Sequence, residues 1–256
     1  MIPLLNLLLN ENMKIYRRMR TWIMMAVIVI LTLTVLLIGH FEAPSLSEAV
    51  ISRTLWHGIS VAGANLIFLC TIFTVVIGAD SVAGEFSSGT IKLLLIRPAS
   101  RAKILLSKYV SMLVFAIVLI LILLISAFLI SGILEGFSSI ADGTAGHVLA
   151  IYGTSSIEML LIVTLAFMLS TVFRSSSLAI GMSLGLLFIG PLLVLLIAKY
   201  SWAKYYLFSN TLTQYVNHDP LIDGLTLNFS IGVLLAYFII FNLLSWVIFI
   251  KRDVAA

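Results

Sequence analysis

Charged residues are scarce in this sequence. Only 10% of its 256 residues are Asp, Glu, Lys or Arg, against roughly a quarter in soluble domains, whereas 61% are hydrophobic. This balance excludes an ordinary soluble globular protein. Cysteine is nearly absent, because Cys70 is the single one, and this excludes an intrachain disulfide framework and a cysteine-based metal site.

Clusters of metal-binding or catalytic side chains are also missing. The four histidines occur singly, without a second ligand three or four positions away: His40, His57, His147 and His218. Ser183 stands in a Gly-x-Ser-x-Gly pattern, but no histidine falls in a span that could activate it. We therefore expect no catalytic, cofactor or metal site on this chain, and we interpret Gly181 and Gly185 as a helix contact.

Long apolar runs are what the sequence does contain. A bilayer core needs roughly 20 apolar residues per helix, and six stretches meet this requirement. They are residues 22–39, 59–79, 109–131, 154–173, 178–198 and 229–250. The runs lack the alternation of a membrane β-strand. The sequence predicts an all-α integral membrane protein that forms one domain over residues 1–256.

The basic residues are distributed unevenly between the two sides of these spans. Of the 15 Lys and Arg residues, 12 fall on the side of the termini, and three fall on the other side: Arg53, Lys199 and Lys204. The positive-inside rule then places both termini in the cytoplasm, and we expect a multi-pass protein of the plasma membrane. This bias also explains the net charge of +4, so we expect no nucleic-acid partner.

Residues 1–20 are predicted to form an amphipathic helix in the cytoplasmic interface, with a frayed tail as the alternative. Polar residues recur at helical spacing and leave apolar residues on the other side. The polar set is Asn6, Asn10, Lys14 and Arg17, and the apolar set is Leu5, Leu8, Leu9 and Ile15.

A few polar or aromatic residues stand out near the other side. Glu158 lies inside the fourth span, where a carboxylate is costly unless it is hydrated or paired, so a pathway role and a structural role are both open. Asn65 and Asn242 are candidates for interhelical hydrogen bonds or pathway contacts. The connector 199–228 is rich in aromatic residues, which favours an interfacial aromatic belt over a lid.

The connector between the second and third spans is the longest charged stretch. Its features follow in this order: Glu85, Gly89, Thr90, the apolar residues Leu93, Leu94 and Ile96, then Arg97, Pro98, Ser100, Arg101 and Lys108. A short helix with an apolar ridge and flanking arginines is suited to the groove of a partner, and Ser100 can cap the next helix. The alternative is an ordinary cytoplasmic loop.

This order of residues resembles the signature of the permease subunits of type 2 ABC exporters, and the arrangement of six spans agrees over nearly the whole chain. The resemblance implies a coupling helix within 85–101 that docks on a separate cytoplasmic ABC ATPase. It also implies short external or re-entrant helices in the connector 199–228, and two permease protomers around a shared path. ATP and Mg would be bound by the partner, because no ATPase domain is fused to this chain.

We therefore expect a bacterial transporter subunit rather than an enzyme, with a non-transporting scaffold or sensor as the alternative. Glu85 and Arg101 would bracket the docking helix as a charge pair outside the bundle. The transported substrate is not predicted, although the sparse charges in the spans favour hydrophobic or amphipathic cargo.

Overall fold

The computed structural model of the chain describes residues 4–42, 54–91, 100–137, 145–217, 222 and 224–251. In these ranges it is helical, and it contains six helices long and apolar enough to cross a membrane. They are α2 (Met19–Glu42), α3 (Leu55–Ser87), α5 (Arg101–Glu135), α6 (Ala145–Val172), α7 (Ser176–Ile197) and α9 (Leu227–Lys251). The prediction of an all-α fold with six membrane spans is confirmed.

Several helices extend beyond their predicted spans. The second span was expected to end at residue 79, but α3 continues to Ser87, and α5 begins eight residues before the expected 109. Both extensions are polar or charged, so a hydropathy window stops before them. Helical hydrogen bonding continues because Ser100 caps α5, accepting from the backbone N–H of Lys103 at 3.4 Å, and because the charges find partners.

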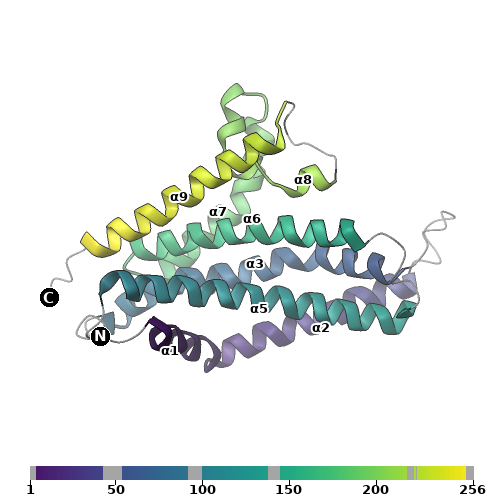
Figure 1. Cartoon of the computed structure of the whole chain (residues 1–256), viewed down its shortest axis with the longest axis horizontal. Helices are drawn as coiled ribbons and strands as arrows, with labels where there is room; N and C mark the ends of the chain where they lie inside the picture. Colours follow the sequence, from purple (N-terminus) through teal and green to yellow (C-terminus); the bar gives the residue numbers. More distant parts are fainter. Residues whose placement is uncertain are drawn as a thin grey trace.

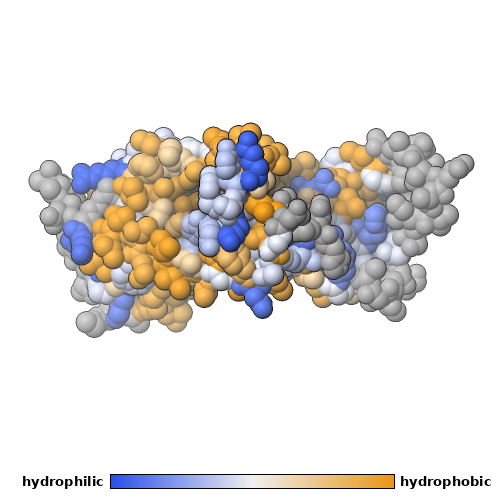
Figure 2. All heavy atoms as spheres, turned by 90° about the horizontal axis from the view of Figure 1, so that it is seen from above, coloured by the Kyte–Doolittle hydropathy of each residue, from blue (hydrophilic) through white to orange (hydrophobic). Residues whose placement is uncertain are grey.

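The centre of the bundle is formed by α3 and α6. More than half of the most apolar window of each helix is buried, 56% in both cases, against 17% for α2. Helix α3 packs against α2, α5, α6 and α7, and Figure 1 shows it in the middle of the layer formed by α2, α3, α5 and α6. The helices that bury little therefore supply the lipid-facing surface, and Figure 2 shows hydrophobic side chains over much of the visible face, with hydrophilic ones toward the ends and in a strip near its middle.

Helix α1 (Leu4–Tyr16) precedes these spans and lies beside α5 (Figure 1). The predicted N-terminal helix is thus present. Glu11 and Lys14 turn toward the bundle and find ion partners there, whereas Leu5 and Leu9 are exposed. Leu7 is the buried residue of this helix.

The connector after α7 folds back onto the bundle as three short helices. These are η3 (Ser201–Tyr205), η4 (Leu207–Ser209) and α8 (Thr213–Val216). Trp202 and Tyr205 are exposed, as an aromatic belt requires, but Phe208 is buried against α7 and α9. Some aromatic residues of this connector therefore form an exposed belt, and others pack the connector against the bundle.

Candidate functional site

Two separate polar sites lie in the bundle, and the first is a charge cluster where α1, α3 and α5 meet. We call this the basic end. The amine of Lys108 on α5 is almost fully buried, with 2% of its side chain exposed, and it contacts Glu11 on α1 at 2.9 Å and Glu85 on α3 at 2.6 Å. It also donates to the Ser81 carbonyl at 3.1 Å. A buried lysine needs such partners to remain charged.

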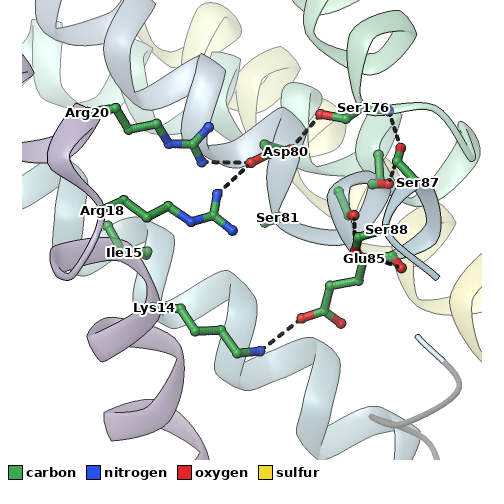
Figure 3. A network of polar contacts seen from close by, with 12 residues as sticks. Lys14, Ile15, Arg18, Arg20, Asp80, Ser81, Glu85, Ser87, Ser88 and Ser176 are labelled. Carbon is green, nitrogen blue, oxygen red and sulfur yellow. Dashed lines mark hydrogen bonds and ion pairs between the residues drawn. The ribbon is translucent and has the colours of Figure 1, made fainter. Parts of the chain in front are cut away.

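Lys14 completes this cluster from α1. Its amine lies 2.6 Å from the Glu11 carboxylate and 2.9 Å from that of Glu85, toward which it points in Figure 3. Burial acts to raise the pKa of the Glu11 carboxyl, but the attraction of Lys108 and Lys14 outweighs it, so that this pKa lies below its ordinary value. Burial likewise acts to lower the pKa of Lys14, and the two glutamates raise it above its ordinary value.

A second group of ion pairs, centred on Asp80, continues the basic end toward α7. Arg20 and Arg18 approach the same Asp80 oxygen at 2.6 and 3.0 Å, and the Ser176 hydroxyl donates to the other oxygen at 2.5 Å (Figure 3). Ser176 begins α7, and its backbone N–H also donates to Ser87 on α3 at 2.8 Å. The end of α3 is thus tied to α1, α2, α5 and α7 by polar contacts.

The structure separates the residues that were expected to act as a charge pair. Glu85 pairs with Lys14 and Lys108, whereas Arg101 donates to the Ile250 carbonyl at the end of α9, at 3.0 Å. Glu85 is also only 14% exposed at the end of a spanning helix, so the expectation that it lies outside the bundle is wrong. The cause is the extension of α3 beyond the predicted span, which brings Glu85 within reach of α1 and α5.

Of the remaining motif residues, some are among those that the structure describes and others are not. Gly89 has a φ of 70°, a left-handed conformation suited to glycine that follows the end of α3. The Thr90 hydroxyl contacts that of Ser88 at 2.9 Å. The central residues of the motif lie outside the residues that the structure describes: Leu93, Leu94, Ile96, Arg97 and Pro98.

Sequence reasoning missed Glu11 and Asp80 as members of the basic end. The signals were weak: Glu11 stands three residues before Lys14, and Asp80 follows the predicted second span directly. Neither spacing reveals that Lys108 reaches Glu11, or that Arg18 and Arg20 reach Asp80, from distant parts of the sequence.

The second polar site surrounds Glu158, which lies midway along α6. One oxygen of its carboxylate accepts from the backbone N–H of Thr213 at 2.8 Å and from the Thr213 hydroxyl at 2.9 Å. Thr213 begins α8, so Glu158 anchors the folded-back connector. The carboxylate also lines a cavity of about 620 Å³ between α3, α6, α7 and this connector.

The two asparagine candidates do not join this site. Asn65 is exposed and its amide donates to Val61 in its own helix at 2.8 Å, and Asn242 likewise donates to Phe238 at 2.9 Å. The expected interhelical hydrogen bonds are therefore not seen for these side chains in the described part of the chain. Gly181 and Gly185 likewise meet open space, so the helix contact expected of them is not made within the described protomer.

The ring of His40, a histidine without a nearby partner in the sequence, lies 2.9 Å from the Glu135 carboxylate across α2 and α5. Among the residues that the structure describes, no group of three or more histidine, cysteine or acidic side chains could hold a metal ion.

Comparison with known proteins places the chain among relatives from Bacillus subtilis (strain 168). It is 38% identical to "Uncharacterized protein YhcI" over 98% of this chain and the whole of that protein. It is 34% identical to "Uncharacterized membrane protein YdbK" over 74% of this chain and 80% of that protein. The model of the family described as "Protein of unknown function (DUF2705)" matches residues 25–255. With nearly its entire length covered, the chain belongs to the DUF2705 family.

Proposed function

We propose that this chain is the permease subunit of an ATP-driven exporter. Two copies would face each other in the plasma membrane, with their termini in the cytoplasm, and a separate cytoplasmic ABC ATPase would dock on each connector 92–99. ATP and Mg would be bound by that ATPase. The chain itself would supply the membrane path and no catalytic group.

The observation that supports this proposal most is that the helices on both sides of residues 92–99 are held to other helices by polar contacts. Its preceding helix, α3, is held to α1 and α5 by Glu85 and Lys108, and its following helix, α5, contacts the end of α9 through Arg101. A force applied to residues 92–99 would therefore be transmitted to four helices together. A transporter needs such a linkage to turn the motion of a soluble motor into a change of the bundle.

The experiment is co-purification of the chain with its ATPase, followed by native mass measurement and assay of ATP hydrolysis. We expect two copies of each chain, no ATP turnover by the permease alone, and turnover in the complex that substrate stimulates. A kinase or an assembly factor in place of an ATPase would favour a scaffold or sensor instead.

The docking segment is tested by Leu94→Asp, which puts an unpaired charge into an apolar contact. We expect the ATPase to be lost from the purified complex while expression and membrane insertion are retained. Arg97→Ala should lower stimulated ATP hydrolysis without unfolding the chain. The control is Lys204→Ala in the opposite connector, which should retain the ATPase. Normal export and normal stoichiometry with Leu94→Asp would show that the segment is an ordinary loop.

A further inference from the structure

The cavity beside Glu158 has the lining of a binding site for a small amphipathic molecule. Its volume of about 620 Å³ falls within the range of ordinary ligand pockets, roughly 300–1,000 Å³. Ile67 and Phe68 of α3, Met159 of α6 and Leu187 of α7 supply apolar walls, and Glu158 and Thr213 are among its polar groups.

Charge at this cavity is of one sign. With histidine counted as neutral, Glu158 is the one formally charged side chain among the lining residues that the structure describes. None of the described lysine, arginine or histidine side chains forms an ion pair with it. This contrasts with Glu11, Asp80 and Glu85 at the basic end, each of which has two cationic partners.

The surroundings make an unpaired carboxylate costly. Glu158 lies within a helix apolar enough to span a membrane, where an ionised group costs a few kcal/mol unless it is paired or hydrated. The two hydrogen bonds from Thr213 offset part of this cost and use only part of the acceptor capacity of a carboxylate. A positive charge brought by a ligand would neutralise the group in an environment of low dielectric constant.

We propose that the cavity binds a lipophilic monovalent cation, with its apolar body against Ile67, Phe68 and Leu187 and its positive centre at Glu158. An apolar wall alone would accept neutral and anionic molecules equally, so the single carboxylate sets the preference for a cation. That this ligand is exported cargo rests on the proposed function, whereas binding to the purified chain does not.

The test uses two ions of nearly the same shape and opposite charge, tetraphenylphosphonium and tetraphenylborate. The purified full-length chain is placed in nanodiscs of phosphatidylcholine, and binding is measured by equilibrium dialysis against empty nanodiscs. We expect saturable binding of tetraphenylphosphonium at one ion per chain and no saturable binding of tetraphenylborate. Uptake equal to that of empty nanodiscs, or equal binding of both ions, would overturn the proposal.

The carboxylate is tested by Glu158→Gln, which keeps an oxygen that accepts from Thr213. We expect tetraphenylphosphonium affinity to fall at least about tenfold, as the loss of one ionic attraction in a site of low dielectric constant implies. The control is Glu135→Gln, a carboxyl at the end of α5 that contacts His40 and lies outside the cavity lining. It should bind like the wild type. Unchanged affinity in Glu158→Gln would assign the binding to another place.

The cavity itself is tested by Ala64→Trp, which adds a large side chain at an exposed lining position without touching the carboxylate. We expect weaker binding here too, with unchanged helix content by circular dichroism. Unaltered binding would show that tetraphenylphosphonium does not bind in this cavity. If tetraphenylphosphonium binds but is neither transported nor able to stimulate an ATPase, the site stands and only its role in holding exported cargo fails; export without this binding would reject the present inference and leave the exporter proposal in place.

Discussion

Lys108 is the residue on which the basic end depends. Its buried amine contacts two carboxylates and one carbonyl from two other helices: Glu11 of α1, and Glu85 and Ser81 of α3. Exposed ion pairs contribute about 0–1 kcal/mol, but a buried charge that loses its partner costs several times more. The pairs of Lys108 therefore differ in kind from those of Arg18, whose side chain is 52% exposed.

We predict that Lys108→Met destabilises the bundle, because Glu11 and Glu85 then keep only the half-exposed Lys14 as a shared partner. The loss should be about 2 kcal/mol or more, which corresponds to a melting temperature lower by roughly 4–8 °C. Thermal unfolding followed by size-exclusion chromatography in detergent measures it. Lys103→Met, earlier on α5 and half-buried, should remain within a degree or two of the wild type; equal melting of both variants would contradict a structural role for Lys108.

At the scale of elements, α1 is attached to the bundle through titratable groups, so its attachment should depend on pH. The pKa of Glu11 is lowered from 4.5, so its stabilising contribution is present above this value and is lost as the pH falls through the folded pKa. The pKa of Lys14 is raised above 10.5, so its contribution is present below 10.5 and is lost as the pH rises through the folded pKa. Attachment should therefore hold throughout the neutral range.

A spin label on α1 tests this pH range, because the mobility of the attached label does not depend on the ionisation of a thiol. Attached at Met13→Cys on α1, in a Cys70→Ser background, it should be restrained at neutral pH and become more mobile as the pH is lowered below 4.5 and through the folded pKa of Glu11. The same label at Leu235→Cys on α9 should change little. If the α1 label is as restrained at low pH as at neutral pH, apolar packing rather than the ion pairs holds this helix.

The connector after α7 depends on a close approach at Gly190. A Cβ atom there would lie 2.2 Å from the ring of Phe208, and the Tyr206 hydroxyl donates to the Gly190 carbonyl at 3.3 Å. We predict that Gly190→Ala displaces η4 and lowers stability by about 1–3 kcal/mol, as overpacking does. Melting temperature and maleimide labelling of Ser209→Cys, which is buried in the wild type, measure the effect.

The matched control for this substitution is Gly181→Ala, two and a half turns earlier on the same helix. A Cβ atom at Gly181 meets nothing within 4 Å, so the change should leave the connector in place and strengthen the helix slightly. Equal behaviour of the two variants would show that the connector is held elsewhere.

At the scale of the whole molecule, contacts at the basic end join α1 and α9, the helices nearest the two termini, to α3 and α5. Helices α3 and α5 are the ones that precede and follow residues 92–99. Arg101 reaches α9, and Lys14 and Arg20 reach α3. Lys199 and Lys204 lie instead in the connector after α7, the same connector whose Thr213 donates to Glu158. The arrangement gives the molecule two chemically distinct ends.

Membrane orientation is predicted from this asymmetry. In a Cys70→Ser background, Ser88→Cys at the basic end should react with an impermeant maleimide only from the cytoplasm, and Ser201→Cys only from outside. Both positions are exposed in the structure. Labelling of both positions from one side would rule out the six-span topology. Labelling of each position from the side opposite to the expected one would show that the orientation is reversed.

The sequence by itself determined the class of fold and the number of spans, because a bilayer imposes length and apolarity on each helix separately. It also indicated Glu158, since an acidic residue in an apolar run is visible without a neighbour. Only the tertiary structure decided which polar side chains contact one another. It joined Glu85 to Lys14 and Lys108 instead of Arg101, and it placed Thr213 against Glu158. Such pairs join residues far apart in the chain, and their contact depends on where each helix ends and which face it turns to its neighbour. Hydropathy does not encode either property.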